Sequence, residues 1–457
     1  MANRRPRKHS RPIRKERAVS SSGDDQSSRA RRALRAIVIA YLFIAASYAV
    51  TIPFGKGPDE TAHVRYIEYL AREHRLPVFD PQNPDPNYEF HQPPLYYALA
   101  LPSYILGGAD ESAQRLLRFF TLLITLPLLY LTWALARLLF PGDPWVAAAA
   151  AGIIAFLPMQ LSVATTIGND GLTEVLAAGV ILLLVRYIHA GASSDQPSSI
   201  HPIRTILACG VLIGLGLLTK SIAVLLLPIV WLSAGFAAKT PEGFSWRQFL
   251  QHALAATAAA LIISGWWLAR NQLLYGDPLA QKAFLQAFQG LRPSPQNFME
   301  QYEVPSVMSY IGQVIIWTAA STTGVFGPIH GNRFAFFPWY IYFITGIVAT
   351  IAAVGFARHL GRTPPKGNQR RAWQLCGAFA LLLLASFVRF NFSFFQAQAR
   401  YLFPALPCAA AAFAIGLRTL FPHRIRPLIL VGAVATLAII AYAGLHIWIS
   451  PQFGIPS

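Results

Sequence analysis

Residues 34–63 read LRAIVIAYLFIAASYAVTIPFGKGPDETAH, an apolar run of about twenty residues followed closely by two adjacent acids, Asp59 and Glu60. A helix of that length crosses a hydrocarbon core of about 30 Å. Adjacent carboxylates are ordinary on a soluble surface, but near the rim of a bilayer they lose part of their hydration. The stretch therefore predicts a membrane-spanning helix that leads into a loop in which the two acids have a functional role.

The whole chain repeats this apolar pattern. Of its 457 residues, 54% are hydrophobic and 13% are charged, and stretches close to twenty apolar residues recur along nearly the full length. We predict an all-α polytopic membrane protein with about eleven transmembrane helices, at 34–53, 116–139, 145–163, 171–190, 203–219, 221–238, 250–269, 338–357, 372–389, 401–419 and 427–448.

The distribution of charge predicts the orientation. The first 35 residues hold twelve Lys/Arg against three acids, and the loop 357–371 is basic without an acid, whereas 54–92 has seven acids against four bases. Because cytoplasmic loops are enriched in Lys and Arg, we place the N-terminus in the cytoplasm and the C-terminus outside, in a plasma (cell inner) membrane. Residues 1–33 are expected to be a disordered basic tail that lies against anionic lipid rather than nucleic acid.

Two apolar stretches are ambiguous. Hydropathy alone does not decide whether 92–108 or 306–327 crosses the membrane, but counting either one alone would move the basic 357–371 loop outside. We therefore interpret 92–108 as an interfacial or re-entrant helix and 306–327 as part of an outer segment.

This topology divides the chain into four parts, with function expected outside. The predicted parts are the tail 1–33, a transmembrane module 34–269 with its outer loop at 54–115, a large outer segment 270–337, and C-terminal transmembrane helices 338–457.

The first outer loop predicts an amphipathic helix over 59–74 that lies along the membrane. Asp59 could simply cap this helix, because a carboxylate there meets free backbone N–H groups. His63 lies four residues on and shares its face, so Asp59 and His63 could hold a divalent metal; no other cofactor is indicated.

Six motifs are distributed along most of residues 34–420. They are GPDETAH (57–63), YEFHQPPLYY (88–97), SVATTIGNDGL (162–172), GLGLLTKS (214–221), WWLARNQLLYGDPL (266–279) and QARYLFPALP (398–407). Together they resemble the GT-C-type glycosyltransferases, which include the protein O-mannosyltransferases and the aminoarabinose transferases.

The resemblance implies a sugar donor carried on polyprenyl phosphate and an inverting transfer on the outer face. The acid pair would be catalytic, with Asp59 as the base that takes a proton from the acceptor hydroxyl and Glu60 beside it. The sugar, a hexose or a pentose, and the acceptor, a lipid, glycan or protein, are left open. One departure weakens the match: His91 and Gln92 stand where the aminoarabinose transferases have Glu and Lys, and Glu89 is displaced by two positions.

Positive side chains at the outer ends of spans offer a phosphate site. Lys220, Arg270 and Arg400 all fall there, where the positive-inside pattern expects few cations. They could clamp a phosphate or merely extend to lipid headgroups.

Neighbouring polar residues reach the same face. Asn169 and Asp170 do so, Tyr401 adjoins Arg400, and Asp170 could either orient substrate or cap the helix that begins at Gly171.

Two other function classes compete with this interpretation. A transporter or flippase of lipid-linked sugars would be expected to carry ionisable groups near the midplane, whereas Arg118, Glu174 and Arg186 lie towards the ends of predicted spans. A non-catalytic assembly subunit would be expected to lose its acid pair, which this chain retains.

Overall fold

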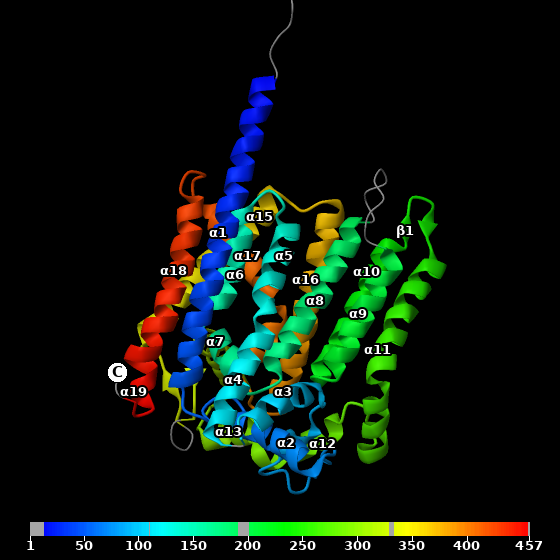
Figure 1. Ribbon diagram of the computed structural model, residues 1–457, viewed down its shortest axis with the longest axis vertical. Coiled ribbons are helices and arrows are strands. Elements are labelled where there is room, and N and C mark those ends of the chain that lie inside the picture. Colours follow the sequence, from blue (N-terminus) through cyan, green and yellow to red (C-terminus); the bar gives the residue numbers. More distant parts are fainter. Residues whose placement is uncertain (1–12, 109, 191–200, 329–332, 456–457) are drawn as a thin grey trace, which may run out of the picture.

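The computed structural model describes residues 13–108, 110–190, 201–328 and 333–455. It is a bundle of long helices, and one end carries a layer of shorter helices, at the bottom of Figure 1. We call this the short-helix end and the opposite end, from which α1 projects, the far end. The C-terminal α19 lies towards the short-helix end.

The long helices supply the membrane-spanning layer. Within the described ranges, eight helical stretches are long and apolar enough to cross a membrane. They are α1 (Ile13–Thr51); α4 (Glu111–Thr125) with α5 (Pro127–Leu139); α8 (Asp170–Ala190); α11 (Trp246–Tyr275); α15 (Trp339–Arg362); α16 (Gly367–Asn391); η3 (Ala399–Ala405) with α17 (Leu406–Leu420); and α18 (Arg426–Gly444) with η4 (Leu445–Ile449) and α19 (Ser450–Gln452).

The remaining three predicted spans correspond to broken or short helices. The first is α6 (Pro144–Phe156) followed by α7 (Pro158–Thr165), and the others are α9 (Pro202–Leu217) and η2 (Ser221–Leu225) with α10 (Leu226–Ala237). All eleven predicted spans thus have a helical counterpart, and the predicted class of polytopic helical membrane protein is confirmed. How many of these helices cross the membrane stays a prediction.

The break between α6 and α7 shapes the short-helix end. The two helices meet at 63°, and Pro158 opens α7 directly after Leu157, which has an extended backbone. Proline cannot donate the backbone hydrogen bond that would continue the helix, so the chain bends there. The bend leads α7 into the turn 166–169 and then directly into α8.

The N-terminal segment differs from the prediction. Residues 13–33, which the composition predicts to be disordered, form the first part of α1, while residues 1–12 lie outside the described residues. The physical reason is that the end of this segment reads RARRA (29–33), which favours a helix, and continues directly into a span. Extending an existing helix avoids the cost of nucleating a new one.

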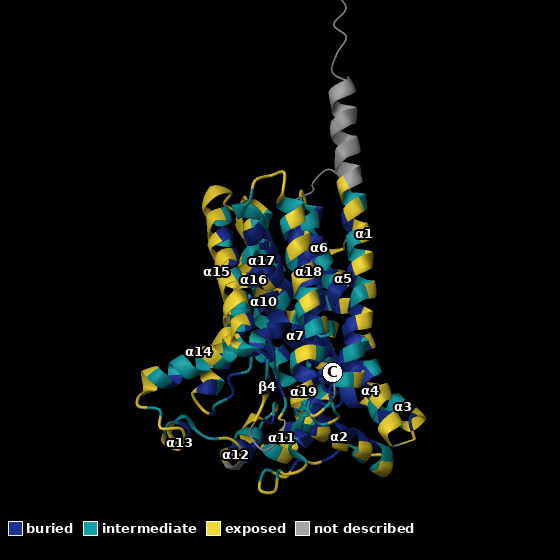
Figure 2. Ribbon diagram, turned by 90° about the vertical axis from the view of Figure 1, so that its left-hand side faces the viewer, coloured by how far each residue is buried: buried dark blue, intermediate teal, exposed yellow. Residues whose placement is uncertain are grey.

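Small residues let neighbouring spans approach closely. At the crossing of α15 and α17, a Cβ added to Gly355 or Gly416 would collide with the backbone of the opposite helix. Such contacts are the usual way in which helices pack in lipid, where van der Waals contact replaces the hydrophobic effect. Figure 2 shows the result: buried residues face the bundle interior and exposed ones cover the outward faces.

The short-helix end is built from the two predicted outer segments. The helices there are α2 (Glu60–Glu73), η1 (Tyr88–His91), α3 (Leu95–Leu106), α12 (Gln281–Leu291), α13 (Pro295–Gln301) and α14 (Val307–Thr323). The amphipathic helix predicted over 59–74 is α2, and the ambiguous stretches 92–108 and 306–327 contain α3 and α14.

Two short antiparallel strand pairs complete the structure. They are β1 (Lys239–Thr240) with β2 (Gly243–Phe244), and β3 (Val325–Phe326) with β4 (Ala335–Phe336).

A second, aromatic core holds the first outer loop in place. Tyr66 of α2 stacks on Tyr97 of α3 with ring centroids 3.7 Å apart, and Tyr96, Tyr97 and Phe90 are buried. These aromatic residues of the YEFHQPPLYY motif therefore pack the loop itself. The loop is a rigid base from which polar side chains can be aimed.

Candidate functional site

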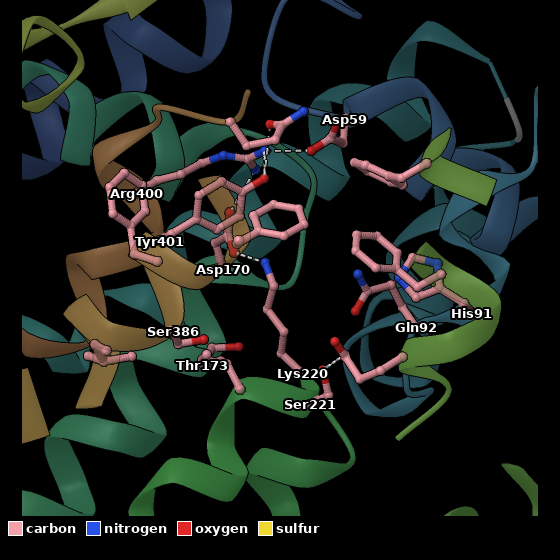
Figure 3. Close-up of a pocket in the computed structure, with 18 of the residues that line it drawn as sticks. Asp59, His91, Gln92, Asp170, Thr173, Lys220, Ser221, Ser386, Arg400 and Tyr401 are labelled. Atoms are coloured by element: carbon pink, nitrogen blue, oxygen red, sulfur yellow. Dashed lines mark hydrogen bonds and ion pairs between the residues drawn. The ribbon is translucent and has the colours of Figure 1, made fainter. Parts of the chain in front are cut away.

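A cavity of about 230 Å³ opens at the short-helix end, enclosed by residues from distant parts of the sequence (Figure 3). Its polar lining comes from the α2 region, η1, the start of α8, the turn before η2, the two ends of α12, the end of α16, and η3. These lining residues are Asp59, His63, Glu89, His91, Gln92, Asp170, Thr173, Glu174, Lys220, Ser221, Gln281, Arg292, Ser386, Arg389, Ser393, Gln396, Arg400 and Tyr401.

Asp59 enters this cavity because of its backbone conformation. It precedes α2 and has φ 55° and ψ 13°, in the left-handed region that Asp tolerates better than most residues. Within the described chain its carboxylate makes no capping hydrogen bond to α2. The loop before it lies against Thr166, and a Cβ added at Gly57 would collide with that side chain. The capping interpretation of Asp59 is therefore wrong, and its carboxylate faces the cavity.

Arg400 joins Asp59 to Asp170. Its Nη2 donates to Asp59 Oδ2 at 2.6 Å, and its Nη1 donates to Asp170 Oδ2 at 2.9 Å (Figure 3). The Nε donates to Gln398 Oε1 at 2.7 Å, so all three guanidinium nitrogens are engaged. The guanidinium also lies 5.1 Å from the ring centroid of Tyr401, close enough for a cation–π contact.

Lys220 binds the second oxygen of Asp170. Its Nζ forms an ion pair with Asp170 Oδ1 and lies 5.8 Å from the ring centroid of Tyr401. Burial lowers the pKa of Lys220, but the neighbouring Asp170 outweighs that effect, and the pKa is raised overall. The lysine therefore remains a cation in the cavity.

Asn169 fixes the backbone around these charges. It is fully buried, and its Nδ2 donates to the carbonyl oxygen of Thr219 at 2.9 Å and to Gln92 Oε1 at 3.2 Å. It thereby ties the start of α8 to the residue before Lys220 and to the loop after η1. Asp170 is the first residue of α8 and pairs with two cations, so its placement agrees with a binding role rather than with a cap at Gly171.

Tyr88 completes the surroundings of Asp59. Its hydroxyl donates to Asp59 Oδ1 at 2.8 Å. Burial raises the pKa of Asp59, but the charge of Arg400 and the hydrogen bonds from Arg400 and Tyr88 outweigh it, so the pKa is lowered well below its usual range. Asp59 is a carboxylate in this structure, with both oxygens hydrogen-bonded.

Three further predicted residues line the same cavity. Burial raises the pKa of Glu89, whose Oε2 has no hydrogen-bond partner among the described residues, and burial lowers the pKa of His63. His63 Nδ1 lies 2.8 Å from the hydroxyl of Tyr97. Burial also lowers the pKa of His91 to about 4, while its Nδ1 donates to the carbonyl oxygen of Tyr88 at 2.5 Å. That bond leaves Nε2 of neutral His91 free to accept a proton or a hydrogen bond.

Glu60 takes a different position from its neighbour. Its carboxylate is fully buried and receives Nε and Nη2 of Arg118, each at 2.7 Å. The same oxygens accept the backbone N–H groups of Gly55 at 2.8 Å and Ile167 at 3.3 Å. Glu60 therefore joins the end of α1 to α2 and α4. This geometry supports a structural role for Glu60 rather than direct contact with a substrate.

Arg270 is also placed apart from the other cations. Its Nη2 donates to the carbonyl oxygen of Pro77 at 2.6 Å, and its guanidinium lies 4.9 Å from the Trp267 ring centroid. Thus Lys220 and Arg400 of the predicted three-cation clamp share the cavity, whereas Arg270 attaches the 75–79 segment of the first loop to α11. Residues on one end of the bundle can face different directions, which hydropathy cannot distinguish.

Two arginines that line the cavity were not among the predicted site residues. Arg389 and Arg292 line the cavity with exposed side chains. Arg389 ends the predicted span 372–389 at its outer end, so the rule that selected Lys220 could have selected it too. Arg292 follows α12 in a loop whose position depends on tertiary packing, and no comparable signal was present.

The structure offers little for a metal. Among the described residues, no group of three or more His, Cys, Asp or Glu side chains is arranged to hold a metal ion. The predicted pair of Asp59 and His63 lines one cavity, but Asp59 is already bound to Arg400 and Tyr88, and His63 contacts Tyr97.

Comparison with known proteins identifies the fold. The oligosaccharyltransferase of Archaeoglobus fulgidus, tethered with an acceptor peptide, matches with a TM-score of 0.55 and 15% identity over 92% of this chain and 55% of that one. ArnT from Cupriavidus metallidurans, bound to undecaprenyl phosphate, matches with a TM-score of 0.51 and 16% identity over 89% of this chain and 64% of that one. The fold is that of the GT-C glycosyltransferases.

Further comparisons agree with this fold. Residues 91–268 match the protein family described as dolichyl-phosphate-mannose-protein mannosyltransferase. The archaeal oligosaccharyltransferase AglB, in complex with an inhibitory peptide and a dolichol-phosphate, matches with a TM-score of 0.55 and 14% identity over 93% of this chain and 56% of that one. A comparison with curated proteins gave no match.

The similarity has a defined extent. The predicted resemblance to the GT-C glycosyltransferases is confirmed in the fold and in the family match over residues 91–268. This chain spans between 55% and 64% of the length of the solved structures named above. The substrates of this site therefore do not follow from the similarity.

Proposed function

We propose that this protein transfers a sugar from a polyprenyl-phosphate carrier to an acceptor hydroxyl, with inversion at the anomeric carbon. The observation that carries the proposal is the convergence of Asp59, Lys220 and Arg400 on one cavity at the end of a GT-C bundle. A carboxylate can take a proton, and two cations can receive a phosphate leaving group.

The proposed reaction uses these groups in one displacement. The acceptor oxygen attacks the anomeric carbon, its proton passes to the Asp59 carboxylate, and the bond between that carbon and the phosphate oxygen breaks. The electron pair of that bond leaves with the polyprenyl phosphate, whose added negative charge is stabilised by Lys220 and Arg400. Because the base and the cations sit together, the leaving phosphate and the attacking oxygen can be held in one geometry.

The cavity has an apolar wall suited to a lipid-linked donor. Its apolar lining includes Phe284, Leu285, Phe288, Phe387 and Phe390. A polar headgroup and the first prenyl units would each meet matching surface there. The membrane lipids themselves are the remaining partners that we propose.

The proposed orientation places this cavity on the outer face of the membrane. The basic loop between α15 and α16 lies at the far end of the bundle, together with the start of α1 (Figure 1). The positive-inside pattern supports a cytoplasmic far end and an outward-facing site.

A transfer assay tests this function. The purified protein in nanodiscs is given synthetic undecaprenyl-phosphate hexoses and pentoses with candidate lipid, glycan and peptide acceptors, and the released undecaprenyl phosphate and the product's anomeric configuration are measured. We expect one donor to yield an inverted product, and we expect Asp59→Asn to yield none while remaining folded. Proteoliposome flux of donor without product, unchanged in Asp59→Asn, would instead show a transporter or flippase.

A further inference from the structure

Two cations of the cavity, Arg400 and Lys220, are already paired with carboxylates of the protein. Arg400 binds Asp59 through Nη2 and Asp170 through Nη1, while Lys220 binds the other oxygen of Asp170. These two acids and two bases form a continuous chain of ion pairs in the order Asp59, Arg400, Asp170, Lys220 (Figure 3). Their formal charges sum to zero, so the cluster carries no excess positive charge for an incoming anion.

Asp170 has the central place in this cluster. It is the residue that contacts both cations, one through each carboxylate oxygen. The non-bridging oxygens of a phosphate could accept the same hydrogen bonds from a lysine and an arginine. A donor phosphate and the Asp170 carboxylate therefore need the same donors.

We propose that Asp170 occupies the phosphate position while the donor is absent, and that donor binding withdraws Arg400 from Asp59. The inference rests on the proposed function, because it identifies the competing anion as the phosphate of the lipid-linked donor. In the loaded state Arg400 and Lys220 turn to the phosphate, and Asp59 keeps only the hydrogen bond from Tyr88. Asp59 then has a free oxygen for the acceptor hydroxyl.

The accessibility of these side chains supports an exchange of partners. Asp59, Asp170 and Lys220 are 21%, 18% and 19% exposed, so an anion can reach them from the cavity. Arg400 is 4% exposed and lines the same cavity, so it is uncovered as the two carboxylates beside it yield their places. The Glu60–Arg118 pair is 0% and 7% exposed, and it offers no such access. The exchange leaves the Asp170 carboxylate without its two cations, and its 18% exposure to the cavity lets water solvate it. A sealed pair would instead leave a buried charge unpaired, which is costly.

The exchange also orders the reaction. Without donor, Asp59 is held by two donors and is a weak base, since both hydrogen bonds favour its charged form. With donor, the cation has moved to the phosphate and the base is released beside the anomeric carbon. Asp170 is thus a positioning residue: it never contacts the reacting atoms, and it sets when Asp59 can act.

Binding of undecaprenyl phosphate to the purified full chain tests this competition. The probe is titrated into wild type and Asp170→Asn in detergent, with bound lipid counted by native mass spectrometry. We expect Asp170→Asn to bind at least about fivefold more tightly, because removing the internal competitor leaves the binding-competent state more populated. Asp170→Glu restores a carboxylate and should bring the affinity back towards wild type, and the KM for the donor should follow the same order.

Asp143→Asn is the matched control. Asp143 pairs with Arg418 at the far end of the bundle, and an asparagine there can still cap α6. We expect wild-type affinity for this variant. If Asp170→Asn does not fold, Asp59→Asn serves instead, since it frees Arg400 from the other side and should also bind the probe more tightly.

The outcomes separate the two proposals. If wild type binds the probe and Asp170→Asn binds it equally tightly or more weakly, the competition is overturned and the proposed function stands. An equal gain in Asp143→Asn overturns it as well, because the effect would then be one of overall charge. Failure of both wild type and Asp170→Asn to bind the probe overturns the proposed function and the competition together.

Discussion

Two adjacent carboxylates, Asp59 and Glu60, have opposite surroundings although each is paired with an arginine. Glu60 and Arg118 form a sealed, two-point ion pair whose remaining donors reach carbonyl oxygens of Ala49, Ile52 and Pro53. Asp59 meets Arg400 through one oxygen at the wall of a cavity.

The difference shows how one short motif serves two purposes. Because the backbone turns at the left-handed Asp59, successive side chains leave it in different directions, one into the helix junction and one into the cavity. The Glu60–Arg118 pair holds the loop rigid, whereas the Asp59–Arg400 pair can exchange partners during the reaction. The predictions below test that division, beginning with the largest expected effect.

Replacing Asp59 should affect activity without affecting stability. We expect Asp59→Asn to lower kcat by about 10²–10⁴-fold, the usual contribution of a positioned general base. Thermal unfolding in detergent should remain close to wild type, because Arg400 keeps its ion pair with Asp170 and its hydrogen bond to Gln398. A variant with normal turnover would remove Asp59 from the mechanism.

Replacing Glu60 should affect stability first. Glu60→Ala leaves Arg118 as an uncompensated buried charge, which should lower the free energy of unfolding by about 3–5 kcal/mol. The matched control is Glu111→Ala, which removes the exposed partner of Arg115 and should cost less than about 1 kcal/mol. Equal effects of the two substitutions on denaturant unfolding would contradict the sealed pair.

Replacing Arg400 by lysine should weaken use of the donor. A lysine keeps one charge but cannot reach two anions with separate nitrogens, so kcat/KM for the donor should fall at least about tenfold. Arg418→Lys, at the far end, is the control and should leave kcat/KM unchanged. Wild-type kinetics for Arg400→Lys would mean that a point charge suffices.

His91 should make the stability of the short-helix end depend on pH. Its pKa in the folded protein is about 4, below the ordinary value of 6.5, because burial disfavours the charged form. Its neutral form therefore stabilises the fold above about pH 6.5, and this contribution is lost as the pH falls towards 4. We expect the melting temperature to fall between pH 7 and pH 5, and to fall less in His91→Gln.

The control for that measurement is His423→Gln. This exposed histidine lies in the loop before α18, so its loss removes an imidazole without touching the site. If the melting temperature has the same pH dependence in wild type and His91→Gln, protonation of His91 does not destabilise the fold.

Tyr88 should have the smallest effect. Tyr88→Phe removes a hydrogen bond that lowers the pKa of Asp59, so that pKa rises. Since Asp59 must be unprotonated to act as a base, the acid limb of the kcat/KM profile should move to higher pH, while kcat near pH 8 changes less than about threefold. Tyr69→Phe, outside the cavity lining, should leave the profile in place, and a shift to lower pH in Tyr88→Phe would reverse the assigned sign.

Much of the site's location could be predicted because it depends on topology. Lys220 and Arg400 were selected for lying at the outer ends of spans, and all such ends meet on one surface of a bundle. The same rule included Arg270, which turns to Pro77 instead, and it should have included Arg389. Hydropathy predicts the depth of a residue in the membrane. The direction in which its side chain leaves the helix depends on packing.

By itself the sequence determined the class of protein, because the length and spacing of apolar stretches are imposed by the thickness of the membrane. It also determined which polar residues share one end of the bundle. Only the tertiary structure decided that Asp59, rather than Glu60, lines the cavity, and that Asp170 holds both cations. Those outcomes depend on the left-handed turn at Asp59 and on contacts between residues up to 341 positions apart, which no local pattern encodes.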